Sequence, residues 1–204
     1  MATFPESASP AARRTREALV TLGAGLRTLH RVLVERSRRD FERQRHAILG
    51  AGELLKLLTS DAHFAWLREL SELIVDLDIF LEIDPVPGDD DAAAVRAEVE
   101  RLLAPPPGIA MAATTDAAPG AASQVPRGLE TPAPGATPGA MPGGSPGEGF
   151  GARYWPYVHD DPQVAIAHGE VKQALRRLPD PRDVDEAAVL HARHLFREAR
   201  SHRA

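Results

Sequence analysis

Leucines recur every three or four residues in the first third of the chain. This spacing places five of them on one stripe of a helix: Leu19, Leu22, Leu26, Leu29 and Leu33. Ser9 and Pro10 form a helix-start signal, so the pattern predicts a long helix from about Pro10 to about Leu49. Gly23 and Gly25 each lower helix propensity by about 1 kcal/mol relative to alanine, which allows a break or kink there.

Three further helices are predicted before residue 104. A short one covers about 53–59, and a second runs from a cap at Ser60 or Asp61 to about Ile83. The second is apolar over most of its circumference, which favours a place in the middle of a bundle. A last helix follows three aspartates at 89–91, where negative charge suits a helix start. Residues 1–103 are therefore expected to form an N-terminal helical bundle.

Residues 104–149 differ completely in composition from the rest of the chain. They contain ten of the 18 prolines and nine of the 16 glycines, with almost no large apolar residues. A segment of this kind buries too little surface to offset its ordering entropy. The composition predicts a disordered Pro/Gly/Ala linker.

Two helices are predicted after the linker, in residues 150–204. Asp161 and Pro162 open the first, which runs to about Leu178, and Asp183 with Glu186 resembles a capping box for the second. So small an element is marginal alone. This C-terminal helical hairpin is expected to dock on the first part, on a second copy of the chain or on a partner. The predicted class is all-α.

Composition excludes some classes of protein and leaves others open. The chain has no cysteine, so disulfides, thiolate metal sites and cysteine nucleophiles are excluded. Neither a signal-peptide core nor a run of 18 apolar residues is found, which favours a cytoplasmic protein without a membrane span. Only two lysines, Lys56 and Lys172, stand against 22 arginines, a bias typical of GC-rich bacterial genomes.

Charge is distributed unevenly. Ten arginines and four acids lie between Arg13 and Arg45, whereas thirteen acids and four basic residues lie between Glu53 and Arg101. Two charged stripes result, one of Arg31, Arg38 and Arg45 and one of Glu69, Glu72 and Asp76. We expect them to lie side by side on antiparallel helices. Nucleic-acid binding through the arginine-rich first helix is an alternative, although acids interrupt the basic run.

The string Ala62-His63-Phe64-Ala65-Trp66-Leu67-Arg68-Glu69-Leu70-Ser71-Glu72-Leu73-Ile74-Val75-Asp76 resembles a stretch found in uncharacterised helical bacterial proteins. The resemblance covers less than a tenth of the chain. It implies an all-α fold and no particular activity.

Two groups of side chains are candidates for chemistry or binding. His191, His194 and Glu198 share one helical face and could hold a divalent metal, completed by His159 or His168. If these residues bind no metal, they are ordinary polar residues of an exposed last helix. Tyr154, Trp155 and Tyr157 follow the linker and either anchor the hairpin onto a partner or form its small core.

The sequence predicts a non-enzymatic adaptor, regulatory or assembly protein that acts through protein contacts or self-association. The alternatives are the histidine/carboxylate metal-binding protein and the nucleic-acid-binding protein. We identify no catalytic residue and expect no cofactor unless the metal site exists.

Overall fold

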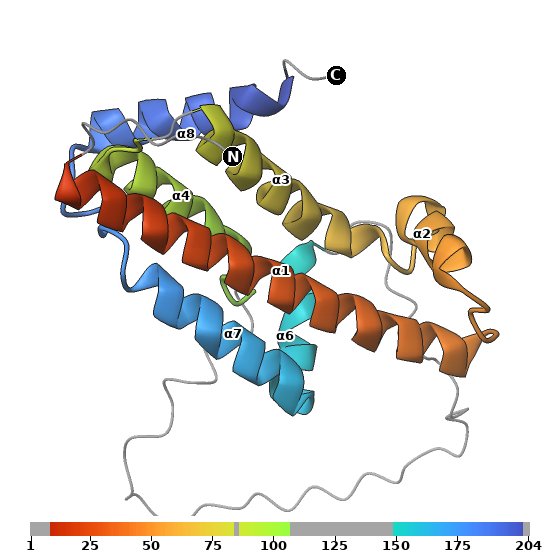
Figure 1. The fold of residues 1–204 in the computed structure, drawn as a ribbon. Helices are drawn as coiled ribbons and strands as arrows, with labels where there is room; N and C mark the ends of the chain where they lie inside the picture. Colours follow the sequence, from red (N-terminus) through yellow and green to blue (C-terminus); the bar gives the residue numbers. More distant parts are fainter. Residues whose placement is uncertain (1–8, 84–85, 107–148, 202–204) are drawn as a thin grey trace, which may run out of the picture.

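The computed structural model describes residues 9–83, 86–106 and 149–201, and only the backbone of Leu195 and of residues 197–201. The described part is helical and contains no strand (Figure 1), which confirms the predicted all-α class. In chain order the elements are α1 (Pro10–Gln44), α2 (Ala51–Ser60), the 3-10 helix η1 (Ala65–Leu67), α3 (Arg68–Ile83), α4 (Asp89–Leu102), α6 (Phe150–Asp160), α7 (Pro162–Leu175) and α8 (Glu186–Ser201). Most of the predicted linker, 107–148, lies outside the described residues.

α1 is the central helix of the fold, with α3 and α7 on different sides of it (Figure 1). Ser9 caps it, because Ser9 Oγ accepts a hydrogen bond from the Ala12 N–H at 3.1 Å. The predicted leucine stripe is its buried face: Leu19, Leu22, Leu26, Leu29 and Leu33 have no exposed surface.

The helix continues through Gly23 and Gly25, so the break allowed by the sequence is not present. A Cβ atom on Gly23 would lie 3.4 Å from Leu77 Cδ2 of α3, and one on Gly25 would lie 3.5 Å from Val171 Cγ2 of α7. Both are ordinary van der Waals distances, so either position has room for a Cβ atom. The packing of α1 against α3 and α7 offsets the low helix propensity of the two glycines.

α1 ends at Gln44, earlier than the predicted end near Leu49. The carboxylate of Glu42 accepts a hydrogen bond from the Ile48 N–H at 3.0 Å and holds the chain in a turn. The third predicted helix also differs, because residues 61–64 form a turn before η1 and α3. Asp61 Oδ1 accepts the His63 N–H at 2.8 Å, a local bond that competes with helix formation.

Residues 150–160 form α6, a helix that the sequence pattern did not predict. Pro156 lies inside it and removes one backbone donor, which is why the local signals oppose a helix here. Phe150 and Tyr154 are four residues apart, and both are buried on one face of α6. The packing of this aromatic face overrides the local preference.

The C-terminal helices dock on the N-terminal part of the same chain. α7 packs along α1, and α8 packs against α4 and α3. One cluster of buried residues spans both sides of the predicted linker and includes Leu22, Leu77, Val99, Phe150 and Val171. Of the three docking alternatives, the structure therefore shows the first. No helix within the described ranges has the length and apolar character needed to cross a membrane.

The salt bridges of α1 differ from those predicted. Arg38 Nε binds a carboxylate oxygen of Glu42, on its own helix, at 3.1 Å. Arg45 binds Asp61 Oδ2 at 2.8 Å. The predicted pairing of these two arginines with the carboxylate stripe of α3 is therefore wrong. Arg38 binds a carboxylate one turn away on its own helix, and Arg45 binds the aspartate that follows α2.

Candidate functional site

The inward face of α1 changes from leucine to polar residues after Leu33. Ser37 and Asp40 continue the stripe, and both are buried. Tyr157 of α6 donates a hydrogen bond from its hydroxyl to Asp40 Oδ2 at 2.8 Å. Burial, followed by this bond to Asp40, raises the pKa of Tyr157 to about 12. The phenol therefore stays protonated at neutral pH and holds α6 on α1.

Arg36 connects this cluster to α7. Its guanidinium nitrogens lie 3.5 Å from Asp40 Oδ2 and 3.5 Å from Asp161 Oδ2, and its Cζ lies 5.5 Å from the ring centroid of Tyr157. Asp161 Oδ1 accepts the Gln163 N–H at 2.9 Å and caps α7. We call Arg36, Asp40, Tyr157 and Asp161 the polar junction, because it ties α1 to α6 and α7.

A hollow of about 440 Å³ opens beside the polar junction. Its lining consists of Arg36, Arg39, Glu42 and Arg43, all from the last turns of α1. These arginines follow one another at i, i+3 and i+7, the spacing of one helical face. The hollow is therefore polar and carries more positive than negative side chains.

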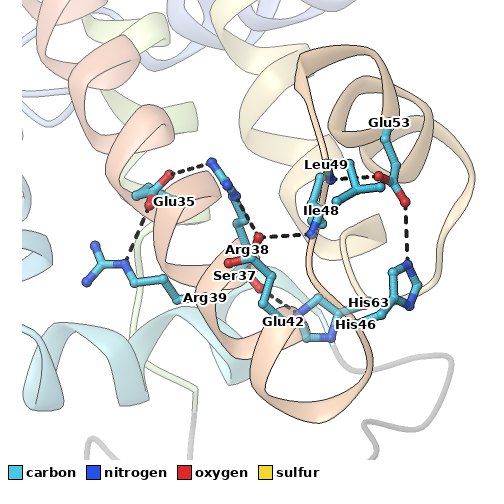
Figure 2. A network of polar contacts seen from close by, with 10 residues as sticks. All are labelled: Glu35, Ser37, Arg38, Arg39, Glu42, His46, Ile48, Leu49, Glu53 and His63. Carbon is cyan, nitrogen blue, oxygen red and sulfur yellow. Dashed lines mark hydrogen bonds and ion pairs between the residues drawn. The ribbon is translucent and has the colours of Figure 1, made fainter.

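A second polar network fixes the loop after α1 and the position of α2 (Figure 2). Glu42 accepts hydrogen bonds from Arg38 Nε and from the Ile48 N–H, and the latter bond is the main reason that the pKa of Glu42 is lowered. Glu53 of α2 accepts the Leu49 N–H at 2.8 Å, and its other oxygen lies 3.4 Å from His46 Nε2.

α2 carries four leucines but buries no residue completely. Leu54, Leu57 and Leu58 are half-buried against the core. Leu55 is 63% exposed, and Leu49, immediately before the helix, is 91% exposed. A ten-residue helix has one face for the core, so leucines on consecutive positions leave one of them in solvent.

Basic side chains lie at both ends of α2 and in its middle. His46 lies beside Glu53 in the first turn of α2, and Arg45 binds Asp61 directly after its last turn. Lys56 is exposed in the middle of the helix, and its ammonium makes no ion pair within the described residues. We call Leu49, Leu55 and Lys56 the α2 surface.

The predicted contact residues Tyr154, Trp155 and Tyr157 lie where α6 meets the rest of the chain. Tyr154 is fully buried and its hydroxyl lies 2.5 Å from His168 Nδ1 of α7. Tyr157 belongs to the polar junction, and Trp155 is half-buried beside His168 with ring centroids 5.4 Å apart. These aromatics anchor α6 inside the molecule. That they also contact a separate partner stays a prediction.

The predicted metal ligands lie on α8. His191 and His194 are exposed, and the side chain of Glu198 lies outside the described residues. His168, one of the two residues expected to complete the site, is bound to Tyr154. Among the side chains that the structure describes, no three histidines or carboxylates meet in a metal-binding arrangement. Metal binding at His191, His194 and Glu198 stays a prediction.

Three histidines at helix contacts make stability depend on pH. His30 Nε2 lies 2.8 Å from Ser71 Oγ, and His63 Nε2 lies 3.0 Å from the Ser37 carbonyl oxygen. Burial lowers the pKa of His30, His63 and His168 below the unfolded value of 6.5. The unfolded chain therefore binds these protons first, so stability is complete above that pH and declines as the pH falls below it.

We predict that the free energy of unfolding decreases between about pH 7.5 and about pH 5.5. Urea unfolding at several pH values measures this dependence. The decrease should be smaller in His30→Gln, which removes one half-buried titrating group. It should be unchanged in His191→Gln, because His191 is exposed. Equal pH dependence in the wild type and in His30→Gln would contradict the assignment to His30.

Comparison with known proteins gives no match, whether with family models, with curated proteins or with solved structures. The candidate site is therefore defined by geometry alone. Sequence reasoning missed the polar junction because Asp40 and Asp161 are 121 positions apart and only the fold brings them together. It also missed the α2 surface, although four leucines in so short a helix were a usable signal.

Proposed function

We propose that the chain is a non-enzymatic cytoplasmic adaptor or assembly protein that holds a protein partner on the α2 surface. The observation that carries this proposal is the exposure of Leu55 and Leu49 on a helix that buries none of its residues completely. Full burial of a leucine side chain is worth about 1.5–3 kcal/mol. A partner that covered both would recover this free energy.

The occupant we propose is an amphipathic helix with acidic residues beside its apolar face. Lys56 follows Leu55 in the sequence, is exposed, and makes no ion pair within the described residues. An acid on the partner would complement its ammonium group and set the orientation of the partner helix. A helix is favoured as the partner because α2 presents a convex ridge, which fits the groove between side chains of another helix.

Other parts of the molecule are weaker candidates for a binding surface than the α2 surface. Tyr154 could meet a partner only if α6 left α7, because it has no exposed surface in this structure. The arginine-rich end of α1 is also a weaker candidate for nucleic acid. Arg38, Arg43 and Arg45 are bound by carboxylates of the chain itself, which neutralise much of the basic face.

Site-specific photocrosslinking tests the proposed contact. We expect benzoylphenylalanine at position 55, introduced in the full chain in its native cells, to form a discrete crosslink to one protein. Lys56→Glu should weaken that crosslink, because it places an acid opposite the partner's acids. The same probe at Ile166 is the matched control, since Ile166 of α7 is 64% exposed but lies outside the α2 surface.

Mass spectrometry then identifies the crosslinked segment, and a synthetic peptide of that segment is titrated against the purified protein. Binding of an acidic amphipathic peptide, weakened about tenfold or more by Leu55→Glu, would support the proposal. Equal crosslinking from positions 55 and 166, or a segment that lacks acids and an apolar face, would refute it.

A further inference from the structure

Two of the three arginines around the hollow, Arg36 and Arg39, are bound less closely than other arginines of the described chain. Arg27 and Arg45 each make a hydrogen bond to a carboxylate, at 2.7 Å and 2.8 Å. By contrast, the carboxylate contacts of Arg36 are 3.5 Å long and that of Arg39, to Glu35, is 3.7 Å. Charge-assisted hydrogen bonds of guanidinium groups are normally about 2.7–2.9 Å.

Arg36 and Arg39 therefore keep nitrogen donors without hydrogen-bond partners. Within the described residues, neither Arg36 nor Arg39 makes a side-chain hydrogen bond, and Arg36 Nε is buried without a hydrogen-bond partner. A buried donor left unsatisfied costs about 1–3 kcal/mol. The side chains of Arg36 and Arg39 are 26% and 49% exposed, so part of each remains accessible to an external acceptor.

The acids near the hollow are already occupied. Glu42 lines it, but its carboxylate is turned toward Arg38 and the Ile48 N–H, as Figure 2 shows. Asp40 accepts the hydroxyl of Tyr157 and also binds Arg43. Arg36 and Arg39 are therefore the arginines of the hollow whose carboxylate contacts, at 3.5 Å and 3.7 Å, are longer than an ordinary charge-assisted hydrogen bond.

Arg36 is also held in place before any ligand arrives. The Tyr157 ring lies beneath its guanidinium at 5.5 Å, and Asp40 and Asp161 lie on its flanks. A donor group fixed in this way loses little side-chain entropy on binding. This differs from an arginine on a solvated helix face, which must be ordered by its ligand.

We infer that the hollow is a binding site for a phosphate group carried by a small molecule. Planar guanidinium forks match phosphate oxygens in pairs, and two of them with unused donors line one side of the cavity. The volume of about 440 Å³ is within the range of small-molecule sites, and its polar lining favours a compact anion over an apolar ligand. The site is separate from the α2 surface and does not rest on the proposed adaptor function.

Calorimetric titration of the full chain tests the inference, with inorganic phosphate and glycerol 3-phosphate as probes at constant ionic strength. We expect both to bind, or the ester alone if groups beyond the phosphate contribute. Arg39→Gln should weaken binding about tenfold or more, since a hydrogen bond to a charged group is worth about 1.5–3 kcal/mol. Arg39 is half-exposed and has one long ion pair, so the variant should fold normally, which circular dichroism checks.

Arg31→Gln is the matched control. Arg31 is an exposed arginine of the same helix outside the hollow, so this variant removes the same charge and should bind within about twofold of wild type. Equal weakening by both variants would overturn the inference, because it would indicate a diffuse charge effect. Failure of both probes to bind would also overturn it. A third result would also overturn the inference: a single-stranded oligonucleotide binds, neither phosphate probe does, and Arg39→Gln does not change the binding.

Discussion

Tyr154→Ala is expected to lower the free energy of unfolding by about 3–5 kcal/mol, the range for removing a buried aromatic ring. Tyr154 has no exposed surface, and its ring stacks on Phe150 with centroids 5.0 Å apart. Its hydroxyl lies 2.5 Å from His168 Nδ1, and burial raises the pKa of the phenol, so the tyrosine is the donor and the neutral imidazole the acceptor. Urea unfolding followed by circular dichroism measures the change.

Two variants separate the parts of this effect. Tyr154→Phe keeps the ring and removes the hydroxyl, so it should cost about 0.5–1.5 kcal/mol. Ile166→Ala removes an exposed side chain of α7 and should stay within about 0.5 kcal/mol of wild type. If Tyr154→Ala cost no more than Ile166→Ala, α6 would not anchor the C-terminal helices as described.

The second expected result is that the residues before and after the predicted linker unfold in one step. Val171 of α7 packs at Gly25 on α1, as Leu77 of α3 packs at Gly23. The leucine stripe of α1 is therefore packed against helices from before and after the predicted linker. Loss of either set of helices exposes part of the same core. Cooperative unfolding follows when neither part buries its apolar face alone.

A buried ion pair makes the same connection at the other end of the molecule. Glu98 of α4 is buried, and its carboxylate lies 2.7 Å from the guanidinium of Arg193 on α8. Arg96, also on α4, donates to the Leu178 carbonyl oxygen at 3.0 Å. Separation of α8 would break the contact with Arg193 and leave Glu98 with Arg101, which lies 3.3 Å away on its own helix.

The sequence predicted the helices that are determined by their own hydrophobic periodicity and capping residues. The stripe from Leu19 to Leu33 and the start signals at Ser9 and Asp161 were sufficient for α1 and α7. These signals are local, because a helical face and a capping side chain act within a few residues. The all-α class followed directly from them.

Features that depend on distant contacts could not be predicted in this way. α6 forms despite Pro156 because Phe150 and Tyr154 are buried against other helices. Asp61 interrupts the expected third helix through a short side-chain bond that competes with helical signals of similar strength. The polar junction forms because Tyr157 and Asp161 meet α1, a juxtaposition that no spacing along the chain indicates.

The most direct test of the shared core uses the two tryptophans of the chain, Trp66 before the linker and Trp155 after it. Trp66→Phe leaves Trp155 as the only tryptophan, and Trp155→Phe leaves Trp66. Urea unfolding of each variant is followed by tryptophan fluorescence and by circular dichroism at 222 nm. We predict that in each variant the two signals share one midpoint. A Trp155 transition that is complete while most of the helical signal remains would contradict the single shared core.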